Sequence, residues 1–219
     1  MLNSMIFLVK EEAMLSEDLL SVIKGRRSTR KFMEKDILDD VLYSIVDAAR
    51  FAPSNTNRQG WKFIVIKNRD LKNNIHKAVG DTVNEILESM TSTVKYRAIR
   101  AYTKYFTFFN DAPVLIVALY KKPSNVAELL MKHTNRVEMI SGELISLSMA
   151  CQNMQLMAHS LGLGTCVLTG PLVAYDPIKK LLNIDDEFEI GCFLAAGYPS
   201  EESFMPKRKE IEQIIEIIK

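Results

Sequence analysis

The sequence predicts an α+β protein in which helices are layered on a sheet. Apolar residues recur at helical spacing in several long segments and alternate or run unbroken in shorter ones, without a regular βαβ order. The 219 residues, at about 150 residues per domain, favour one elaborated domain spanning 1–219. A content of 47% hydrophobic and 25% charged residues is typical of a globular protein.

The helices and strands of the first part follow in order. Ser16 can cap a short helix that Gly25 ends in a left-handed conformation. Asp36 opens a second helix, which ends before Pro53 because the residue before a proline is pushed out of helical geometry. A polar loop then leads into a strand over residues 61–67.

The later elements are predicted from apolar spacing, from prolines and from the glycines that end helices. In chain order they are a long helix from Asp70, a strand buried on both faces over 114–120, a loop over 121–126, a helix over 137–161 that stops at Gly162, a strand over 165–168, a helix capped by Asp176, and a strand over 188–196. We expect the helix over 137–161 to lie at the centre of the core.

Composition excludes several classes of function. Lys and Arg total 28 against 27 Asp and Glu, so the formal charge of +1 gives no overall basic field for nucleic acid. The apolar runs stop far short of the roughly 18 residues that a membrane-spanning helix needs. The three cysteines, at positions 151, 166 and 192, match no disulfide framework, which favours a reducing compartment, the cytoplasm. We expect neither nucleic acid nor a membrane as a partner.

Two polar segments contain candidate binding residues. Residues 26–31 read Arg-Arg-Ser-Thr-Arg-Lys, and arginine presents a planar fork that matches phosphate oxygens. Residues 53–60 form a loop with three amides and two hydroxyls, which can bind the polar edge of a flat heterocycle. From the residues alone, a solvated basic face and an ordinary helix-to-strand connection remain open as alternatives.

The other common motifs of enzyme sites are missing from the sequence. Gly162-Leu163-Gly164 lacks the third glycine of the dinucleotide fingerprint and follows a helix. The three histidines are far apart, so we expect no metal site and no catalytic nucleophile. His159 lies inside the apolar helix and reads first as a core or interface histidine.

Taken together, the segments resemble the FMN-dependent nitroreductase family. The resemblance covers residues 20–212 and rests on the order and spacing of four motifs. These are 26–32 (R-R-S-T-R-K-F), 52–63 (A-P-S-N-T-N-R-Q-G-W-K-F), 162–166 (G-L-G-T-C), and Gly197-Tyr198-Pro199 followed by Arg208. Gly60 departs from the family's usual proline, and Asn55 from its common serine. The resemblance implies a three-layer α/β/α fold around a mostly antiparallel sheet, with FMN as cofactor.

The resemblance also implies roles for single residues. Arg26, Arg27 and Ser28 would meet the phosphate and ribityl chain of FMN, and Arg208 would close on the phosphate. Arg30 would lie near the pyrimidine edge of the flavin, where positive charge stabilises the reduced ring.

Other implied contacts come from a homodimer with two FMN molecules at its interface. Asn57 would hydrogen-bond the ring from the same chain, whereas Pro53, Ser54 and Asn55 would pack on it from the partner chain. The C-terminal arm, 206–219, would wrap the other subunit, while 1–14 form an N-terminal extension. Three further residues would run beside the ring with their backbone groups: Leu168, Thr169 and Gly170.

The implied reaction is a ping-pong transfer of hydride from NADH or NADPH through FMN to a small planar acceptor, such as a nitroaromatic or a quinone. Because the flavin carries this chemistry, we expect no catalytic acid, base or nucleophile. The aromatic segment 96–109 is either a lid over the acceptor slot or part of the core. Three alternatives remain: a family relative that dehalogenates, degrades flavin or dehydrogenates; a flavin carrier or redox sensor; and a polyanion-binding protein.

Overall fold

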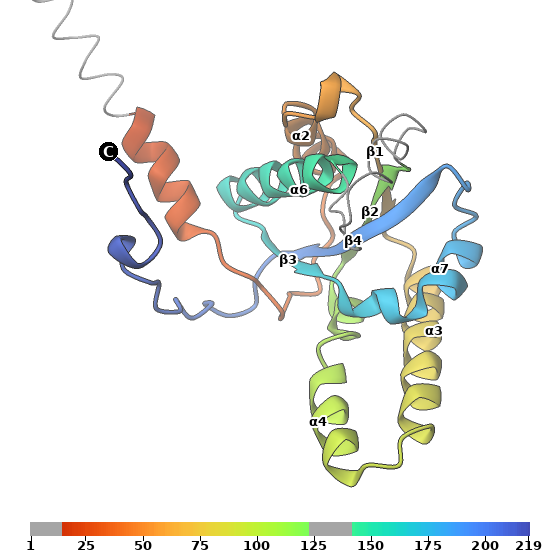
Figure 1. Ribbon diagram of the computed structural model, residues 1–219. Helices are drawn as coiled ribbons and strands as arrows, with labels where there is room; N and C mark the ends of the chain where they lie inside the picture. The colour runs from red at the N-terminus through yellow and green to blue at the C-terminus, as the bar shows by residue number, and fades with distance from the viewer. Residues whose placement is uncertain (1–14, 123–141) are drawn as a thin grey trace, which may run out of the picture.

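The fold is α+β, as predicted, in a computed structural model that describes residues 15–122 and 142–219. Its centre is a four-stranded antiparallel sheet in the order β1-β2-β4-β3. The strands are β1 (Trp61–Ile66), β2 (Val114–Lys121), β3 (Gly164–Leu168) and β4 (Phe188–Gly197). Helices cover both faces of the sheet, which gives the three layers expected (Figure 1).

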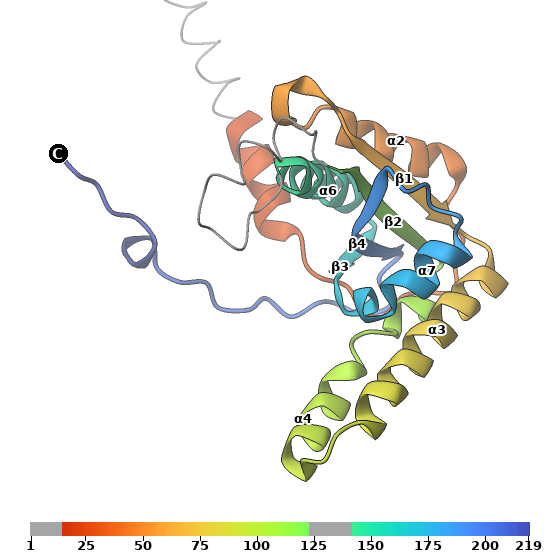
Figure 2. The same ribbon diagram turned by 45° about the vertical axis from the view of Figure 1, so that its right-hand side comes forward.

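Helices α2 (Asp39–Arg50) and α6 (Gly142–Ser160) cover one face of the sheet, as both views show (Figure 2). The strand β2 is buried on both faces, as predicted, so alternate residues of it reach this core and the opposite one. The core on this face includes Leu42, Ile45, Ile116, Leu147, Met154 and Leu194, each no more than 6% exposed.

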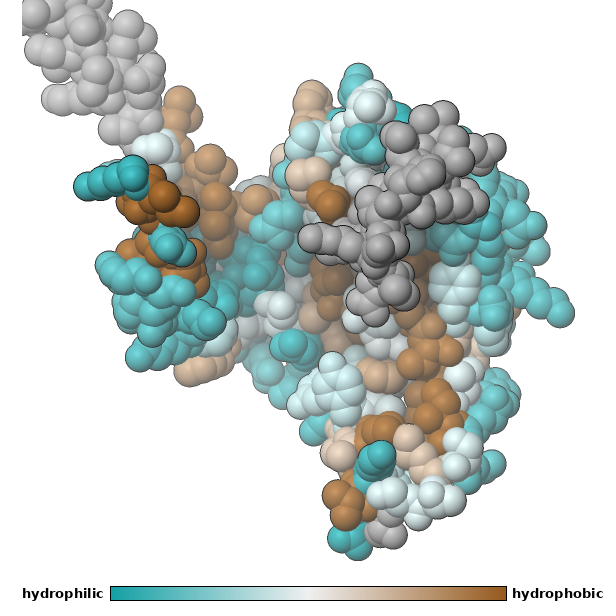
Figure 3. All heavy atoms as spheres, viewed as in Figure 1, coloured by the Kyte–Doolittle hydropathy of each residue, from teal (hydrophilic) through white to brown (hydrophobic). Residues whose placement is uncertain are grey.

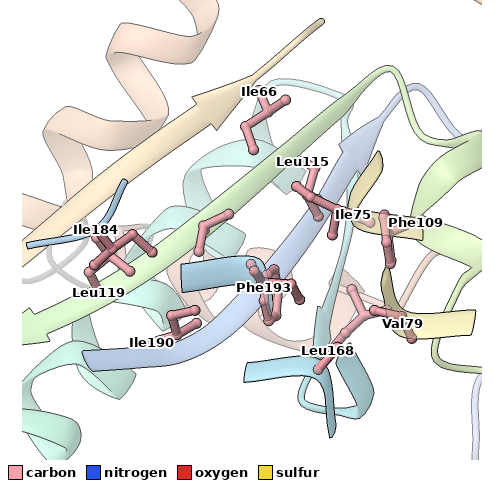
Figure 4. Close-up of a cluster of buried hydrophobic side chains, with 14 of the residues drawn as sticks. Ile66, Ile75, Val79, Phe109, Leu115, Leu119, Leu168, Ile184, Ile190 and Phe193 are labelled. Atoms are coloured by element: carbon pink, nitrogen blue, oxygen red, sulfur yellow. The ribbon is translucent and has the colours of Figure 1, made fainter. Parts of the chain in front are cut away.

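The second core lies on the opposite face, under α3 (Arg69–Glu88) and α7 (Tyr175–Leu181) (Figure 4). Phe193 of β4 and Phe109 are fully buried there. Three shorter elements flank this face: α4 (Thr93–Thr103), η2 (Phe108–Asp111) and η3 (Gly170–Ala174). Helix α4 returns along α3, and the two helices project from the sheet as a hairpin (Figure 1).

Two helix boundaries around the basic segment differ from the prediction. Residues 15–25 are helical, so Ser16 lies inside a helix and does not cap it. Gly25 is the last helical residue and has no left-handed conformation. A Cβ on Gly25 would stand only 2.5 Å from Nε2 of His159, so this glycine allows the close approach of α6.

Other predicted boundaries are shifted by a few residues. Helix α2 begins at Asp39, three residues after Asp36, because Asp36 instead forms an ion pair with Lys67 at 2.9 Å. Helix α7 begins at Tyr175 with Ala174 at the cap position, so Asp176 lies in the first turn and is not the cap.

Other predictions for helix ends are met more closely. Helix α3 begins one residue before Asp70, and the side chain of Asn68 accepts a 2.8 Å hydrogen bond from the backbone of Leu71. Gly162 ends α6 at φ 76° in the left-handed region. Residues 137–141 of the predicted helix, 123–126 of the predicted loop and the extension 1–14 lie outside the described residues.

The C-terminal tail and the helix 15–25 lie away from the body of the molecule (Figures 1 and 2). Both expose apolar side chains, which gather at this end of the surface (Figure 3). The exposed side chains are those of Leu15, Leu19, Leu20, Ile23, Ile211, Ile214, Ile215, Ile217 and Ile218. Among the helices described, none is long and apolar enough to cross a bilayer.

Candidate functional site

The basic segment 26–31 is fixed along the edge strand β3. Ser28 forms a parallel bridge with Thr165, and the backbone N–H of Thr29 donates to the Thr165 carbonyl at 3.0 Å. Gly164 makes this approach possible, because a Cβ there would lie 2.2 Å from Oγ1 of Thr29. The side chains of the segment are therefore presented from a defined backbone rather than from a free loop.

The basic segment and the C-terminal tail together line a hollow of about 690 Å³, which we call the basic hollow. Five cations line it against two carboxylates, and one of these, Glu201, is paired with Lys31 at 2.8 Å. The hollow thus has an excess of positive charge. Its lining residues are Arg26, Arg27, Ser28, Arg30, Lys31, Glu201, Glu202, Ser203, Phe204, Pro206 and Arg208.

The three arginines of the segment are in different states. Nη1 of Arg26 is buried and has no hydrogen-bond partner among the described residues. The guanidinium of Arg27 instead donates to the carbonyls of Lys24 and Arg26, at 2.7 Å for Arg26, while Nη1 of Arg30 lies 3.4 Å from the Ser28 carbonyl. A buried donor without a partner is costly, so Arg26 is the group best placed to gain from a bound anion.

A second hollow of about 600 Å³ lies beside the same arginines and is lined by Gly25, Thr29 and His159 as well. Partial burial, together with the charges of Arg26 and Arg27, lowers the pKa of His159 below its usual range. The sequence predicts a core or interface histidine at position 159, and the structure places His159 half-buried against the basic segment. His159 therefore adds a neutral imidazole to this second hollow, because burial and the charges of the two arginines disfavour its protonated form.

The polar loop 53–60 has an unusual backbone. Thr56, Asn57 and Gln59 have φ of 49°, 54° and 49°, in the left-handed region, around the short turn η1 (Asn55–Asn57). Such conformations cost about 1–3 kcal/mol each in residues other than glycine, and less for asparagine. Ser54 holds the turn: its carbonyl accepts from the Asn57 backbone at 2.9 Å and its hydroxyl accepts from the Gln59 backbone at 3.0 Å.

The same loop is anchored on the first turn of α6. Arg58 forms a 2.7 Å ion pair with Glu143, whose side chain is only 5% exposed. The backbone N–H of Asn55 donates to the hydroxyl of Ser146 at 3.0 Å. Glu143 and His159 are 16 positions apart in this helix, or ~24 Å at 1.5 Å per residue. Within one chain the loop and the basic segment therefore lie at opposite ends of α6 and are not brought together.

The third group of predicted site residues lies where β3 ends. Leu168 is the last residue of the strand, and Thr169 and Gly170 lead into η3. The ring of Phe106 packs directly on Gly170, where a Cβ would stand 2.2 Å from its Cδ1 atom. The turn after α4 is thereby held against this end of the sheet.

The aromatic segment 96–109 is neither wholly a lid nor wholly core. Phe109 is fully buried, whereas Tyr102 and Tyr105 are 64% and 47% exposed. Phe106 lies between these states and meets Tyr102 edge to face, with ring centroids 5.5 Å apart. The exposed ring of Tyr102 thus stands against Phe106, which packs on Gly170, while Phe109 belongs to the core.

Two features of the site carried no signal in the sequence. Glu143 reads as an ordinary acidic residue in the first turn of a helix, yet it is the buried anchor of the polar loop. The contact of Phe106 with Gly170 joins residues 64 positions apart and depends on the fold. In the parts of the chain that the structure describes, no group of three side chains is suited to hold a metal ion.

The chain is similar to known proteins over most of its length. The family model described as Nitroreductase family matches residues 23–198. A protein of Methanothermobacter thermautotrophicus, provisionally named NADH dehydrogenase/NAD(P)H nitroreductase, is 30% identical over 90% of this chain and 87% of its own length.

Two solved structures share the fold. A BluB-like flavoprotein from Clostridium difficile 630 superposes with a TM-score of 0.83 at 33% identity, covering 92% of this chain and 99% of its own. An oxidised iodotyrosine deiodinase bound to FMN and 3-iodo-L-tyrosine superposes with a TM-score of 0.67 at 23% identity, covering 88% and 95%.

Proposed function

Because the chain belongs to the nitroreductase family, we propose that it is an FMN-dependent oxidoreductase that uses NADH or NADPH to reduce a small planar acceptor, such as a nitroaromatic or a quinone. The observation that carries the proposal is the basic hollow, with the unpartnered and buried Nη1 of Arg26 in its wall. When bound, FMN would supply the hydride chemistry, so the proposal requires no catalytic acid, base or nucleophile from the chain.

The residues of the basic hollow fit the phosphate end of FMN. Arg26 and Arg208 reach it from two distant parts of the chain, and Ser28 adds a hydroxyl. Charge-assisted hydrogen bonds from arginine to phosphate are worth about 1.5–3 kcal/mol each. Arg27 would first have to break its hydrogen bonds to two backbone carbonyls before it could bind the phosphate. We therefore assign Arg26 and Arg208 the larger share of the binding free energy.

The ring of FMN would lie along the end of β3. Leu168, Thr169 and Gly170 would offer backbone groups beside it, and Arg30 would place a charge near its pyrimidine edge. Phe106, which packs on Gly170, would close one side of the ring's surroundings and exclude water there. An open face remains for the nicotinamide and the acceptor to occupy in turn.

A second copy of the chain would complete the site. The loop residues Pro53, Ser54, Asn55 and Asn57 share one hydrogen-bonded turn at the far end of α6 from Arg26. We therefore assign all four to the FMN of the neighbouring chain, and Asn57 leaves the same-chain role that the sequence resemblance implied. The tail 206–219 supports a homodimer, because its five isoleucines are each at least 52% exposed in one chain.

We further propose a single domain over residues 1–219 and a cytoplasmic location. In the described structure the three cysteines are free, although the sulfurs of Cys151 and Cys192 lie only 3.8 Å apart. A pair this close would be open to oxidation in a compartment that forms disulfides. A cytoplasmic environment keeps it reduced.

The decisive experiment is the visible absorption spectrum of the purified protein, before and after incubation with FMN and desalting. We expect flavin bands, and we expect NAD(P)H oxidation that depends on an added nitroaromatic or quinone. A protein without flavin bands after incubation contradicts the proposal. A yellow protein that oxidises NAD(P)H no faster with any acceptor favours the carrier or sensor instead.

A double variant, Arg26→Ala with Arg208→Ala, tests the position of the phosphate. We expect FMN retention to fall by at least about tenfold, which equals the loss of 1.4 kcal/mol. The matched control removes two exposed cations elsewhere, with Lys35→Ala and Lys180→Ala, and should retain FMN as the wild type does. Equal retention in both doubles would show that the phosphate binds elsewhere.

A further inference from the structure

Helix α4 and the turn after it carry four cations and no carboxylate over residues 93–104. All four side chains are exposed, and none forms an ion pair with a carboxylate of the described structure. They are Lys95, Arg97, Arg100 and Lys104. Within residues 15–122 and 142–219, the positive charge of α4 is therefore not neutralised by ion pairing.

Two of these cations are held by neighbouring aromatic side chains. Arg100 donates to the hydroxyl of Tyr96 at 3.1 Å, and Nζ of Lys104 lies 5.0 Å from the ring centroid of Tyr105. Such contacts orient a cation but leave its charge in place. Arg100 and Lys104 are thus positioned at the end of α4 that leads to Phe106 and Gly170.

A cleft of about 490 Å³ opens between α3 and α4, and these two cations line it. The α3 wall contributes His76, Asn84 and Glu88, of which Glu88 is the one carboxylate among the lining residues. The α4 wall is therefore positive, and the cleft has room for a small aromatic molecule. Clefts with an excess of one sign of charge raise the encounter rate of an oppositely charged ligand by about 10–10³-fold.

We propose that α4 makes the protein select negatively charged acceptors, with Arg100 and Lys104 as the specificity-determining residues. The substrate class is a planar aromatic acceptor that carries a carboxylate, sulfonate or phosphate group. This inference rests on the proposed function, because it needs the acceptor to approach beside Phe106 and Gly170. It adds a charge preference that neither the family nor the basic hollow requires.

The test uses FMN-loaded protein reduced with dithionite and mixed anaerobically with acceptor, so that NAD(P)H takes no part. In this half-reaction the nitro group takes up two electrons and two protons, becomes a nitroso group and releases water, while the reduced flavin is oxidised. The acceptors are 4-nitrobenzoate, 4-nitrobenzyl alcohol and 4-nitrobenzylamine, which carry a negative, no and a positive charge. Each rate is expressed as variant over wild type, so intrinsic reactivity cancels.

For the double variant Arg100→Gln with Lys104→Gln, we expect the reoxidation rate with 4-nitrobenzoate to fall at least ~3-fold. The rate with 4-nitrobenzyl alcohol should be unchanged, and the rate with 4-nitrobenzylamine should rise. Glu88→Gln should shift the rates in the opposite direction. The control Lys35→Gln with Lys180→Gln removes the same total charge outside the hairpin and should leave all three ratios near one. If the double variant fails to fold, the single variants and Glu88→Gln give the same comparison.

Ionic strength supplies a measurement on the unmodified protein. The advantage of 4-nitrobenzoate over 4-nitrobenzylamine should shrink as salt rises, because the Debye length falls from about 10 Å at 0.1 M to about 3 Å at 1 M. If the ratios of variant rate to wild-type rate do not depend on the charge of the acceptor, the inference about α4 is wrong, whereas the proposed function is unaffected. The inference is also wrong if the double variant slows the reduction of the flavin by NAD(P)H but not the reoxidation of the flavin by the acceptor. A wild-type protein that none of the three acceptors reoxidises overturns the proposed function as well.

Discussion

At the scale of single residues, Gly170 sets how closely Phe106 can approach the end of β3. The change Gly170→Ala would place a Cβ 2.2 Å from Cδ1 of Phe106, so the ring or the backbone must move. We expect a loss of about 1–3 kcal/mol in the free energy of unfolding, the usual effect of overpacking. Urea denaturation followed by circular dichroism measures it.

Gly80→Ala is the matched control for this change. Gly80 lies inside α3 with no atom within 4 Å of the position its Cβ would take. Alanine in a helix is favoured over glycine by up to about 1 kcal/mol, so this variant should be slightly more stable than the wild type. Equal effects of the two substitutions would contradict the contact between Gly170 and Phe106.

His159 predicts a pH dependence of stability. Its pKa in the folded protein is lowered by burial and by Arg26 and Arg27, so as pH falls the unfolded chain takes up its proton first. The stability of FMN-free protein should therefore fall between pH 7.5 and 5.5, through the usual histidine range. His159→Gln should flatten this fall, as measured by urea midpoints at several pH values.

The same measurement on FMN-loaded protein tests the link to the basic hollow. An anionic phosphate beside Arg26 offsets the charge that disfavours protonation of His159, so the fall in stability should be smaller when FMN is bound. If wild type and His159→Gln show the same pH dependence without FMN, His159 does not titrate as described.

What could be predicted for single residues depended on sequence proximity. Arg26, Arg27, Ser28 and Arg30 lie in one short segment, so their common surface in the basic hollow was open to inference from the sequence. The contact between Gly25 and His159 was not, because 134 positions separate them and only the packing of α6 joins them. The helix does end at Gly25, as expected, but Gly25 does not adopt the left-handed conformation predicted for it and instead lets His159 approach closely.

At the scale of elements, the ion pair of Arg58 with Glu143 holds the polar loop on α6. Removing Arg58 leaves the carboxylate of Glu143, which is 5% exposed, without this partner. Removing one partner of a buried ion pair lowers the free energy of unfolding more than replacing both partners does. Because Arg58 itself is 34% exposed, we expect Arg58→Ala to cost about 2 kcal/mol. Thermal or urea unfolding measures this cost.

The loop's share in cofactor binding gives the same variant a second readout. If the loop serves a neighbouring FMN, Arg58→Ala should also weaken FMN retention, since the strained turn loses its anchor. Arg50→Ala, which removes the exposed partner of Asp47, is the control and should change stability by less than about 1 kcal/mol. Unchanged FMN retention in Arg58→Ala would separate the loop from the cofactor.

The order of strands and most helices could be predicted because apolar spacing survives in the sequence of each element. Helix boundaries shifted where tertiary contacts compete with local caps, as Asp36 does by pairing with Lys67. The strained turn at Thr56 could not be predicted, since a β-branched residue disfavours φ of 49°, and the hydrogen bonds of Ser54 within the loop together with the contacts of the loop with α6 maintain it.

For the whole molecule, one chain presents the two parts of the proposed flavin site at opposite ends of α6, and the described residues leave each isoleucine of its tail at least 52% exposed. Among the described residues no strand pairs with the outer edge of β1, which lies beside a mainly apolar groove of about 420 Å³ lined by Asp39, Leu42, Tyr43, Val46, Phe63, Val65 and Lys67. Exposed edges and apolar grooves of this kind favour association with an extended segment. These features together argue for the homodimer more strongly than any one of them.

The tail gives the test of that assembly. Deleting residues 210–219 removes all five exposed isoleucines but retains Arg208, so a loss of FMN cannot be blamed on the phosphate contact. A fully buried isoleucine contributes about 1.5–3 kcal/mol, so the deletion should shift the protein from dimer to monomer at micromolar concentration. Sedimentation velocity measures the mass. As the dimer dissociates and releases FMN, the absorbance of the flavin should no longer sediment with the protein.

Glu212→Gln with Glu216→Gln keeps the isoleucines and alters only the charge of the tail, and it should sediment as the wild type does. A deletion protein that stays dimeric and yellow would show that the tail is not the exchanged arm. A wild-type protein that sediments at the mass of one chain, while it binds FMN and turns over, would show that one chain suffices. That result would require the polar loop at the far end of α6 to have another purpose, since ~24 Å of helix separates it from the arginines.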